Sequence, residues 1–304
     1  MNLIADEPSL AAATGPAPAG APLEQLERWL GGRTMVALTG AGCSTESGIP
    51  DYRGPGRLGP PRNPILHDAF MRRPEVRQRY WARATLGWSR FAGAGPNPAH
   101  HALVALETAG PLLGVITQNV DRLHQRAGSR RVIELHGALE DVRCLGCSAA
   151  FARTEVHGWL LEANPGWLER AAAAAPDGDA QLEPAEVADF HVLPCAGCGG
   201  VLKPDVVFFG GTVPAATVAE AWALLEAAEA LLVVGSSLEV YSGFRFVRGA
   251  AARGIPVVIV NQGPTRGDAL AACRVDARAG AVLPPLVARL AAPGGSPPAT
   301  AASR

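Results

Sequence analysis

The chain lacks an excess of charge of either sign: its 304 residues carry 27 Lys and Arg against 28 Asp and Glu, a formal net charge of −1. Such a balance produces no overall field that would draw the molecule onto nucleic acid or an anionic membrane. The sequence also contains no apolar run that approaches the ~20 residues needed to cross a bilayer. We therefore expect neither direct nucleic-acid binding nor insertion into a membrane.

The first residues lack the features of the common targeting peptides. They include Asp6 and Glu7, and no basic stretch precedes an apolar one, unlike in a secretory signal. Mitochondrial presequences are poor in acidic residues, which argues against that destination too. A cytoplasmic location is therefore expected, and there the six cysteines favour metal ligands or free thiols over disulfides.

The composition is that of a globular, loop-rich protein, with 48% apolar residues, 35 Gly and 26 Pro. Residues 1–21 and 292–304 are rich in Ala, Pro and Gly without any period, so both are predicted to be disordered tails.

Between these tails, short apolar runs alternate with helical patterns. Helices are expected near residues 22–30, 97–109, 214–229, 242–253 and 264–272. Strands are expected at residues 34–38, 112–117, 132–135, 206–209, 230–234 and 256–260. Continuous apolar strands separated by helices are typical of a parallel sheet covered on both faces, so the predicted fold is a doubly wound, Rossmann-like α/β domain.

Two stretches interrupt the alternation and are predicted to form a smaller second domain. Residues 58–96 are basic and aromatic, and we expect a helical insertion there that flanks the long loop after the first strand. Residues 141–203 contain two C-x-x-C pairs and are expected to be a zinc-binding module. The Rossmann-like domain then comprises residues 22–57, 97–140 and 204–291.

The first predicted strand leads directly into a glycine-rich loop, residues 40–53. Glycines at this place let backbone N–H groups approach a phosphate, and a following helix N-terminus adds partial positive charge. The G-x-G-x-x-G fingerprint is incomplete because Thr45 replaces its third glycine, so a tight turn is the alternative explanation of Gly40 and Gly42. The polar end of the loop (residues 50–53) offers more hydrogen-bonding groups than a turn needs.

Polar residues also follow two further predicted strands, at the edge where doubly wound folds bind ligands. Gln118, Asn119 and Asp121 come directly after one strand, and His136 ends the next. Helix capping is the alternative role for Asn119 or Asp121, and a lone histidine is commonly structural. The convergence of these residues on one edge, together with a side-chain pKa near neutrality, favours His136 as a general base.

Four cysteines form the pairs Cys144/Cys147 and Cys195/Cys198, each within a glycine-rich knuckle. Four thiolates suit a closed, tetrahedral, structural Zn²⁺ site, and a redox pair is the alternative. Further along, residues 235–237 and 261–263 follow strands with Gly, Ser and Asn, which bind ribose hydroxyls or simply form turns. The apolar run after Lys203-Pro204-Asp205 is either a core strand or an edge for an extended peptide.

These motifs, in this order, resemble the signature set of the sirtuin family. The resemblance covers residues from about 22 to 290 and rests on the cysteine pairs and on residues 40–42, 47–53, 117–121, 136–137, 203–210, 235–238 and 261–265. Tyr52, residues 77–83 and the wide cysteine spacing resemble the class II branch of that family, which includes a member with lipoamidase and ADP-ribosyl-transfer activities. In three places the chain departs from the pattern: Gly211 replaces a common acidic residue, Ala279 replaces a frequent Cys, and Tyr80 and Arg83 spell the Y-x-x-R of desuccinylating sirtuins.

The resemblance implies an NAD-dependent protein lysine deacylase with one structural Zn²⁺ on Cys144, Cys147, Cys195 and Cys198. The catalytic residues would be His136, as general base, and Asn119. The implied NAD site comprises Gly40, Ala41, Gly42, Ser44, Thr45, Ile49, Pro50, Asp51, Tyr52, Arg53, Gln118, Asn119, Val120, Asp121, Gly235, Ser236, Ser237, Asn261, Gln262, Gly263 and Ala279.

The implied substrates are acyl-lysine proteins, whose acyl group passes to ADP-ribose as nicotinamide is released. Protein mono-ADP-ribosylation and lipoamidase activity are alternatives on the same scaffold. A hydride-transferring dehydrogenase would share the sheet, but it normally has the complete glycine fingerprint and an acidic residue about 20 positions later. A non-enzymatic zinc-ribbon module would explain the cysteines and leave the glycine-rich loop without a role.

Overall fold

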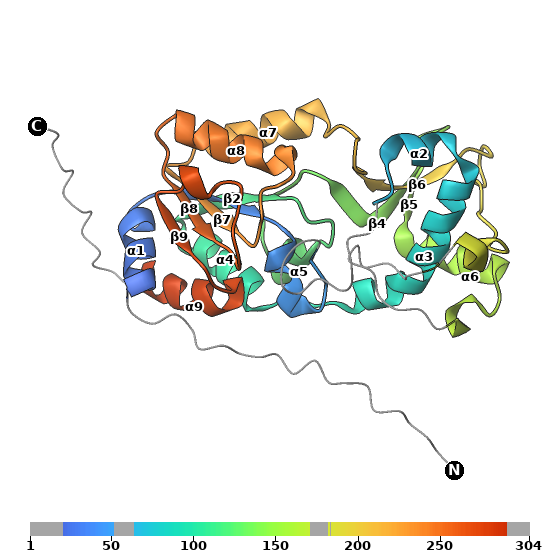
Figure 1. Cartoon of the computed structure of the whole chain (residues 1–304), viewed down its shortest axis with the longest axis horizontal. Helices are drawn as coiled ribbons and strands as arrows, with labels where there is room; N and C mark the ends of the chain where they lie inside the picture. The colour runs from blue at the N-terminus through green and yellow to red at the C-terminus, as the bar shows by residue number, and fades with distance from the viewer. Residues whose placement is uncertain (1–20, 52–63, 171–181, 183, 291–304) are drawn as a thin grey trace, which may run out of the picture.

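The computed structural model describes residues 21–51, 64–170, 182 and 184–290, and its elements form a large and a small group along the longest axis of the molecule (Figure 1). The large group is built on a six-stranded sheet. Its strands are β1 (Met35–Thr39), β2 (Leu112–Thr117), β3 (Val132–Glu134), β7 (Ala230–Val234), β8 (Val257–Val260) and β9 (Cys273–Val275). They pair in parallel in the order β3-β2-β1-β7-β8-β9, which is the doubly wound order, so the predicted fold class is confirmed.

Helices cover both faces of this sheet. One layer contains α1 (Ala21–Leu30), α4 (Pro98–Ala109) and α9 (Ala279–Leu290), and the other contains α7 (Ala215–Glu226) and α8 (Tyr241–Ala252). Because side chains alternate along a strand, β1 contributes Met35 and Ala37 to the first core and Val36 and Leu38 to the second. A short helix, α5 (Leu123–Ala127), follows β2.

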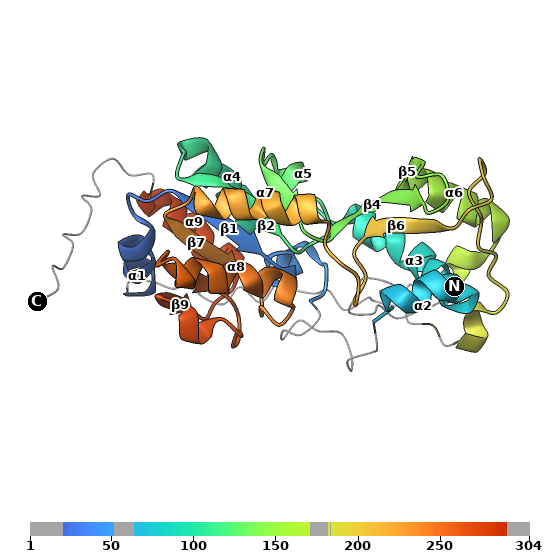
Figure 2. The ribbon, with the colours of Figure 1, turned by 90° about the horizontal axis from the view of Figure 1, so that it is seen from above.

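The small group combines segments that lie far apart in the sequence, as the view from above shows (Figure 2). It contains the helices α2 (His67–Arg72), α3 (Pro74–Gly93) and α6 (Arg153–Ala163) and the strands β4 (Gly137–Cys144), β5 (Ala150–Ala152) and β6 (Leu202–Val206). The three strands are antiparallel in the order β5-β4-β6, so β6 is an edge strand. Phe70 of α2, Trp81 of α3 and Leu160 of α6 share one buried core with Cys144 and Cys195.

Short 3-10 turns complete the described chain: η1 (Ala41–Cys43), η2 (Thr45–Ser47), η3 (Trp167–Glu169), η4 (Pro184–Val187) and η5 (Asp268–Leu270). None of the helices in the described ranges combines the length and the apolar character that a bilayer crossing requires.

Two of the expected elements are wrong. The apolar run 206–209 is no strand of the parallel sheet: β6 ends at Val206, and Phe208 instead packs its ring against Phe70. The expected helix 264–272 is reduced to η5, because the Asp268 carboxylate accepts hydrogen bonds from the backbone N–H and the hydroxyl of Thr265. Such side-chain bonds offer the backbone an alternative to a helix.

Candidate active site

The loops after β1 and β7 meet at the point where the strand order of the sheet reverses. Gly42 N–H donates to the carbonyl oxygen of Gly235 at 2.8 Å, and Gly40 N–H donates to that of Val234 at 3.1 Å. A Cβ atom on Gly40 would lie 2.8 Å from Cβ of Ser236, and one on Gly42 would lie 2.9 Å from the Gly235 oxygen. The glycines therefore allow two loops to touch at the switch point, where ligands bind in this fold.

Three of the predicted site residues form one buried hydrogen-bond network beside this contact. The Ser44 hydroxyl donates to Oδ2 of Asp121 at 2.6 Å and accepts from Nδ2 of Asn119 at 3.0 Å. The other oxygen of Asp121 accepts from Leu123 N–H at 3.0 Å, so Asp121 also orders the start of α5. Burial raises the pKa of the Asp121 carboxyl, and the bonds from Ser44 and Leu123 oppose this rise.

The rest of the glycine-rich loop runs from the sheet edge to the start of α9. The Thr45 hydroxyl donates to the Gly42 carbonyl at 3.1 Å, and Oε2 of Glu46 accepts from Gly280 N–H at 2.9 Å. Gly280 follows Ala279, so this bond places the loop beside the predicted adenine-side residue. Ile49 and Pro50 are half-buried and Asp51 is buried. The predicted residues Tyr52 and Arg53 lie outside the described residues.

His136 lies just beyond β3, with both ring nitrogens engaged. Nδ1 is 2.8 Å from the carbonyl oxygen of Gln118, and Nε2 is 2.7 Å from Oγ of Ser242. Burial lowers the pKa of His136; the backbone bond to Gln118 raises it, and the charge of Arg245 lowers it. A neutral imidazole at neutral pH is the form that a general base requires.

Gln118 connects β2, the loop after β7 and the start of α8. Its side-chain Nε2 donates to Oγ of Ser236 at 2.8 Å. A Cβ atom on Gly243 would lie 2.6 Å from Cδ of Gln118, so the glycine leaves room for this side chain at the start of α8. Ser242 and Gly243 were not predicted as site residues. The signal for them is a Ser-Gly pair at the start of a helix that closely follows the Gly-Ser-Ser end of a strand.

The loop after β8 is held together largely by its own residues. Nδ2 of the buried Asn261 donates to the carbonyl oxygens of Gln262 at 2.9 Å and Gly263 at 3.0 Å. Gly263 N–H donates to Oδ1 of Asp276 at 3.0 Å. Asn261 therefore shapes this loop, the Gln262 side chain is exposed, and Asp276 is a partner that the sequence analysis missed.

The four paired cysteines converge in the small group. Their Sγ atoms all lie within 4.8 Å of one another, with Cys144 and Cys198 3.4 Å apart and Cys147 and Cys195 3.9 Å apart. Tetrahedral Zn²⁺ with Zn–S bonds near 2.3 Å would place the sulfurs about 3.8 Å apart.

The backbone of the knuckles also fits thiolate ligands. Gly146 N–H points at Sγ of Cys144 at 3.3 Å, and Gly200 N–H points at Sγ of Cys198 at 3.4 Å. Hydrogen bonds from the backbone, that of Cys147 first, lower the pKa of the Cys144 thiol. A Cβ atom on Gly200 would lie 2.9 Å from Sγ of Cys144, so the glycine leaves room for the cluster. The residues present therefore fit one structural Zn²⁺.

A second group, Cys43, His100 and His124, also offers ligand atoms within 4.8 Å of one another. Asn97 N–H donates to Nδ1 of His100 at 3.3 Å, which leaves the proton on Nε2 and no lone pair for a metal. Burial lowers the pKa of His100 to about 4 and that of His124 to about 3, and it raises the pKa of Cys43. We assign this group a structural role beneath the glycine-rich loop.

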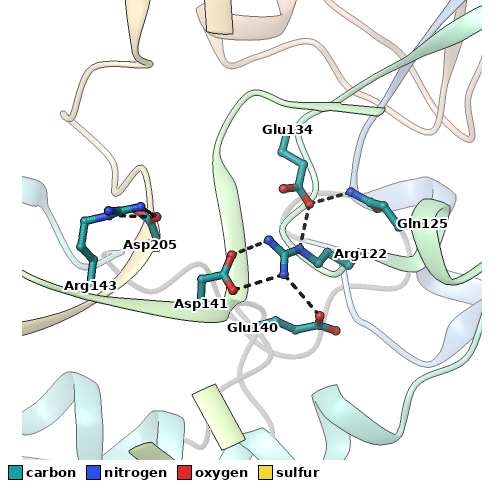
Figure 3. A network of polar contacts seen from close by, with 7 residues as sticks. All are labelled: Arg122, Gln125, Glu134, Glu140, Asp141, Arg143 and Asp205. Carbon is teal, nitrogen blue, oxygen red and sulfur yellow. Dashed lines mark hydrogen bonds and ion pairs between the residues drawn. The ribbon is translucent and has the colours of Figure 1, made fainter. Parts of the chain in front are cut away.

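A charged network joins the sheet edge to β4 (Figure 3). Arg122, at the N-cap of α5, lies 3.4 Å from Glu134, 3.6 Å from Glu140 and closer still to Asp141. Gln125 donates to the same oxygen of Glu134 at 2.8 Å. Arg122 therefore ties the residues after β2 to the first strand of the small group.

A cleft of about 310 Å³ opens where the two groups meet. Its lining includes His67, Glu134, Lys203, Asp205, Gly211 and Thr217. It therefore lies directly beside His136-Gly137 and the edge strand β6.

Comparison with known proteins agrees with this arrangement. The model of the Sir2 family matches residues 40–242. An "NAD-dependent protein deacetylase" of Xanthomonas axonopodis pv. citri (strain 306) is 56% identical over 242 residues, which are 80% of this chain and 83% of that protein. "NAD-dependent protein deacetylase 1" of Streptomyces coelicolor is 53% identical over 256 residues, 84% of this chain and 86% of that protein.

Solved structures give the same result. "Structure of Sir2Tm bound to a propionylated peptide" has a TM-score of 0.70 and 32% identity, and the match covers 88% of this chain and 98% of that chain. "Sir2-p53 peptide-NAD+" has a TM-score of 0.67 and 33% identity, covering 88% and 95%. The family model matches well over half of the described residues, and the relatives match along most of their length. The chain belongs to the Sir2 family.

Proposed function

We propose that this protein is an NAD-dependent protein lysine deacylase of the deacetylase type, which transfers the acyl group to ADP-ribose and releases nicotinamide. The observation that carries the proposal is the position of His136. His136 bonds the carbonyl of Gln118 through Nδ1, which leaves Nε2 as its basic atom, and Gln118 directly precedes Asn119 of the Ser44–Asn119–Asp121 network. The names of relatives that are more than 50% identical support the same activity.

The residues at the switch point suit NAD. Gly40, Ala41, Gly42, Ser44, Thr45, Ile49, Pro50 and Asp51 would face its phosphates and the nicotinamide half from the loop. Gln118, Asn119, Val120 and Asp121 would hold the nicotinamide ribose and carboxamide, and Gly235, Ser236, Ser237, Asn261, Gln262, Gly263 and Ala279 the adenosine side. The close approach of Gly42 to Gly235 leaves backbone rather than side chains at this edge, which is what a bound dinucleotide needs.

The hydrogen bonds of the chain's own groups indicate which role each group would have in the reaction. When bound, NAD supplies an electrophilic ribose carbon and the hydroxyl that accepts the acyl group. Asn119, whose amide is oriented by Ser44, would hold the ribose in place. His136 would remove the hydroxyl proton at Nε2, while its Nδ1–H remains bonded to the Gln118 carbonyl. A base positioned in this way contributes typically ~10²–10⁴-fold to the rate.

Zn²⁺ would be held by Cys144, Cys147, Cys195 and Cys198 and would stabilise the small group without contacting substrate. We propose the domain division given by the sequence, with residues 22–57, 97–140 and 204–291 as the NAD-binding domain and 58–96 and 141–203 as insertions. The shared core of α2, α3, α6 and the cysteine knuckles supports this division.

Acyl-lysine peptides would bind in the cleft between the two groups. Strand β6 has an unpaired edge among the described strands, and an extended peptide can add to such an edge through main-chain hydrogen bonds. Residues of β6 and Gly137, which follows His136, line the cleft together, and this supports the proposed site. We propose proteins with acyl-lysine as substrates, no direct nucleic-acid ligand, and a cytoplasmic location as the sequence predicts.

The alternatives are less well supported. The relatives are named deacetylases, which favours deacylation over mono-ADP-ribosylation or lipoamidase activity. Tyr80 and Arg83 are only 4% and 8% exposed, and the Tyr80 ring packs edge-on against Phe70. This burial favours a structural role for the pair over recognition of a succinyl carboxylate.

The test is a panel of acetyl-, propionyl-, lipoyl- and succinyl-lysine peptides incubated with NAD. We expect nicotinamide release that depends on the acyl peptide, fastest with acetyl-lysine, and no absorbance change at 340 nm. Reduction of NAD would indicate a dehydrogenase. Nicotinamide release with ADP-ribose attached to the protein partner, and with no loss of acyl group, would indicate an ADP-ribosyltransferase.

A further inference from the structure

The hydrogen bond of His136 to a backbone carbonyl fixes which of its nitrogens is basic. A carbonyl oxygen only accepts hydrogen bonds, so Nδ1, 2.8 Å from the Gln118 oxygen, must carry the proton. The neutral ring then has its lone pair on Nε2. That lone pair is directed at Oγ of Ser242, 2.7 Å away. The Ser242 hydroxyl is therefore the donor in this contact.

Ser242 is held at this place by the start of α8. It is the second residue of that helix, it is 9% exposed, and the next residue, Gly243, packs directly on the Gln118 side chain. Gln118 thus orients His136 through its backbone carbonyl, and its side chain positions Ser242 by packing against the next residue, Gly243. The Ser–His pair is built from three segments that meet only in the folded chain.

The groups around the His136 ring favour its neutral form in the resting protein, so that Nε2 takes up a proton only during the reaction. Arg245, one turn further along α8, is the charged side chain whose field acts on the His136 ring, and Gln118 faces the ring with a neutral carbonyl. The N-terminus of the 12-residue helix α8 adds partial positive charge near Oγ of Ser242, which stabilises negative charge developing there. In the resting protein the ring stays neutral, and its basic atom, Nε2, accepts a hydrogen bond from the Ser242 hydroxyl.

We propose that Ser242 relays the proton between the ribose hydroxyl of NAD and His136. The ribose O–H bond breaks as its proton passes to Oγ of Ser242, and the Ser242 proton passes to Nε2 of His136. The Ser242 hydroxyl is thereby restored, His136 becomes imidazolium, and the ribose oxygen keeps the electron pair with which it attacks the acyl carbon. The relay rests on the proposed deacylase function and adds a residue to it.

The test combines kinetics of Ser242→Ala with nitrogen NMR of His136 in protein without NAD. Deacylation should fall about 10- to 100-fold, a part of the ~10²–10⁴ that general-base catalysis contributes. Exchange of labelled nicotinamide into NAD needs no base and should stay within about twofold of the wild type. Ser242→Thr, which keeps the hydroxyl, should recover most of the activity.

The NMR experiment reads the contact directly. In Ser242→Ala the Nε2 resonance of His136 should shift and its pKa should rise, because the lost hydrogen bond stabilised the neutral ring. Ser129→Ala, a buried serine whose hydroxyl has no partner among the described residues, is the matched control and should change neither resonance nor rate.

Three results would overturn the relay. These are unchanged deacylation in Ser242→Ala, an equal loss of exchange and deacylation, or a His136 resonance that does not respond to the substitution. A wild type that releases no nicotinamide in the presence of any acyl peptide would refute the proposed function and the relay with it. The His136 resonance would still decide separately whether the hydrogen bond exists.

Discussion

His136 is oriented by the backbone of the residue that follows β2, rather than by an acidic side chain. The Gln118 carbonyl holds Nδ1–H and so fixes the tautomer, but it carries no full charge that would stabilise the imidazolium. The same residue positions Gly243 and bonds Ser236. A single glutamine therefore links the proposed base to both loops at the switch point.

Replacing this base should separate the two halves of the reaction. His136→Ala is expected to slow deacylation by about 10²–10⁴-fold, because the proton acceptor is lost. Nicotinamide exchange should survive better, since the first ribosyl transfer needs no proton removed. Exchange, deacylation and melting temperature are measured on one preparation. Near-normal deacylation would exclude His136 from the mechanism, and a common loss with unfolding would make it a scaffold residue.

Asp121 is the second residue whose role can be isolated. Asp121→Asn should reduce kcat/KM for NAD by about 10- to 100-fold, because a charged hydrogen-bond partner is worth roughly 1.5–3 kcal/mol. Nicotinamide inhibition should weaken in parallel, while ADP-ribose binding, measured by calorimetry, stays close to that of the wild type. Unchanged NAD dependence together with unchanged nicotinamide inhibition would contradict the assignment.

Among individual residues, the sequence predicts those that belong to a short, continuous sequence motif. Gly40, Gly42 and the cysteine pairs are recognisable because each belongs to a short motif in the sequence, although the partners they contact, such as Gly235 and Cys198, lie far along the chain. Ser242 and Glu46 belong to no such motif, and their partners, His136 and Gly280, lie more than 100 residues away. Pairing over such distances depends on how the helices cover the sheet, which no single segment encodes.

Among the elements, the contact between α4 and α5 depends on two buried, neutral histidines. Their rings lie 4.8 Å apart, His100 on α4 and His124 on α5. His124 lies 2.9 Å from the Thr39 hydroxyl at the end of β1, and that hydroxyl in turn bonds Thr117 of β2. These helices are therefore joined to the sheet directly beneath the glycine-rich loop.

This pair predicts a loss of stability in acid. The pKa of His100 falls to about 4 in the folded protein, below the unfolded value near 6.5, so the unfolded state binds more protons between these values. The stability is complete above pH 6.5 and is lost as the pH falls. One such group costs about 2 kcal/mol at pH 5 relative to pH 7. The free energy of unfolding, measured with urea at several pH values in this range, should fall less steeply with decreasing pH in His124→Gln than in the wild type. An equal pH dependence of the two proteins would contradict the explanation.

The Arg122 network predicts a measurable coupling between β4 and the residues after β2. Arg122→Met should lower the free energy of unfolding by about 1–2 kcal/mol, because several partly buried charged hydrogen bonds are lost. Arg143→Met is the matched control: Arg143 and Asp205 are both more than 40% exposed, and such pairs contribute about 0–1 kcal/mol. Equal effects of the two substitutions in urea unfolding would argue against a special role for Arg122.

The elements themselves were predictable where the hydrophobic pattern is unambiguous. Leu112–Thr117 and Ala230–Val234 coincide with their predicted strands because continuous apolar runs are typical of central parallel strands. Helix α9 had no prediction, since Pro284 and Pro285 lie inside it and proline usually ends a helix. The three-residue strand β9 is too short for a pattern to indicate it.

On the scale of the whole molecule, the large group is stabilised by two apolar cores and the small group by a core that includes Cys144 and Cys195. The knuckles that carry these cysteines contain tight glycine turns and little regular structure. We infer that zinc binding contributes folding free energy here, because such ligand sets do not exist preformed in unfolded chains.

Replacing one of the zinc ligands should therefore lower the stability of the fold, and activity should fall as a consequence. Cys147→Ser is expected to lower the zinc content of the purified protein, its soluble yield and its melting temperature, and activity should fall with them. Cys273→Ala, at a cysteine outside the cluster, should keep its zinc. Well-folded wild-type protein without stoichiometric zinc by elemental analysis would contradict the structural metal site.

The most direct test of the account is a product balance in a single reaction. Wild-type protein is incubated with NAD and an acetyl-lysine peptide, and nicotinamide, free lysine peptide and acetyl-ADP-ribose are quantified by mass spectrometry. A deacylase that uses ADP-ribose as acyl acceptor predicts equal amounts of all three products. Free acetate and unconsumed NAD, or nicotinamide without any loss of the acetyl group, would contradict it.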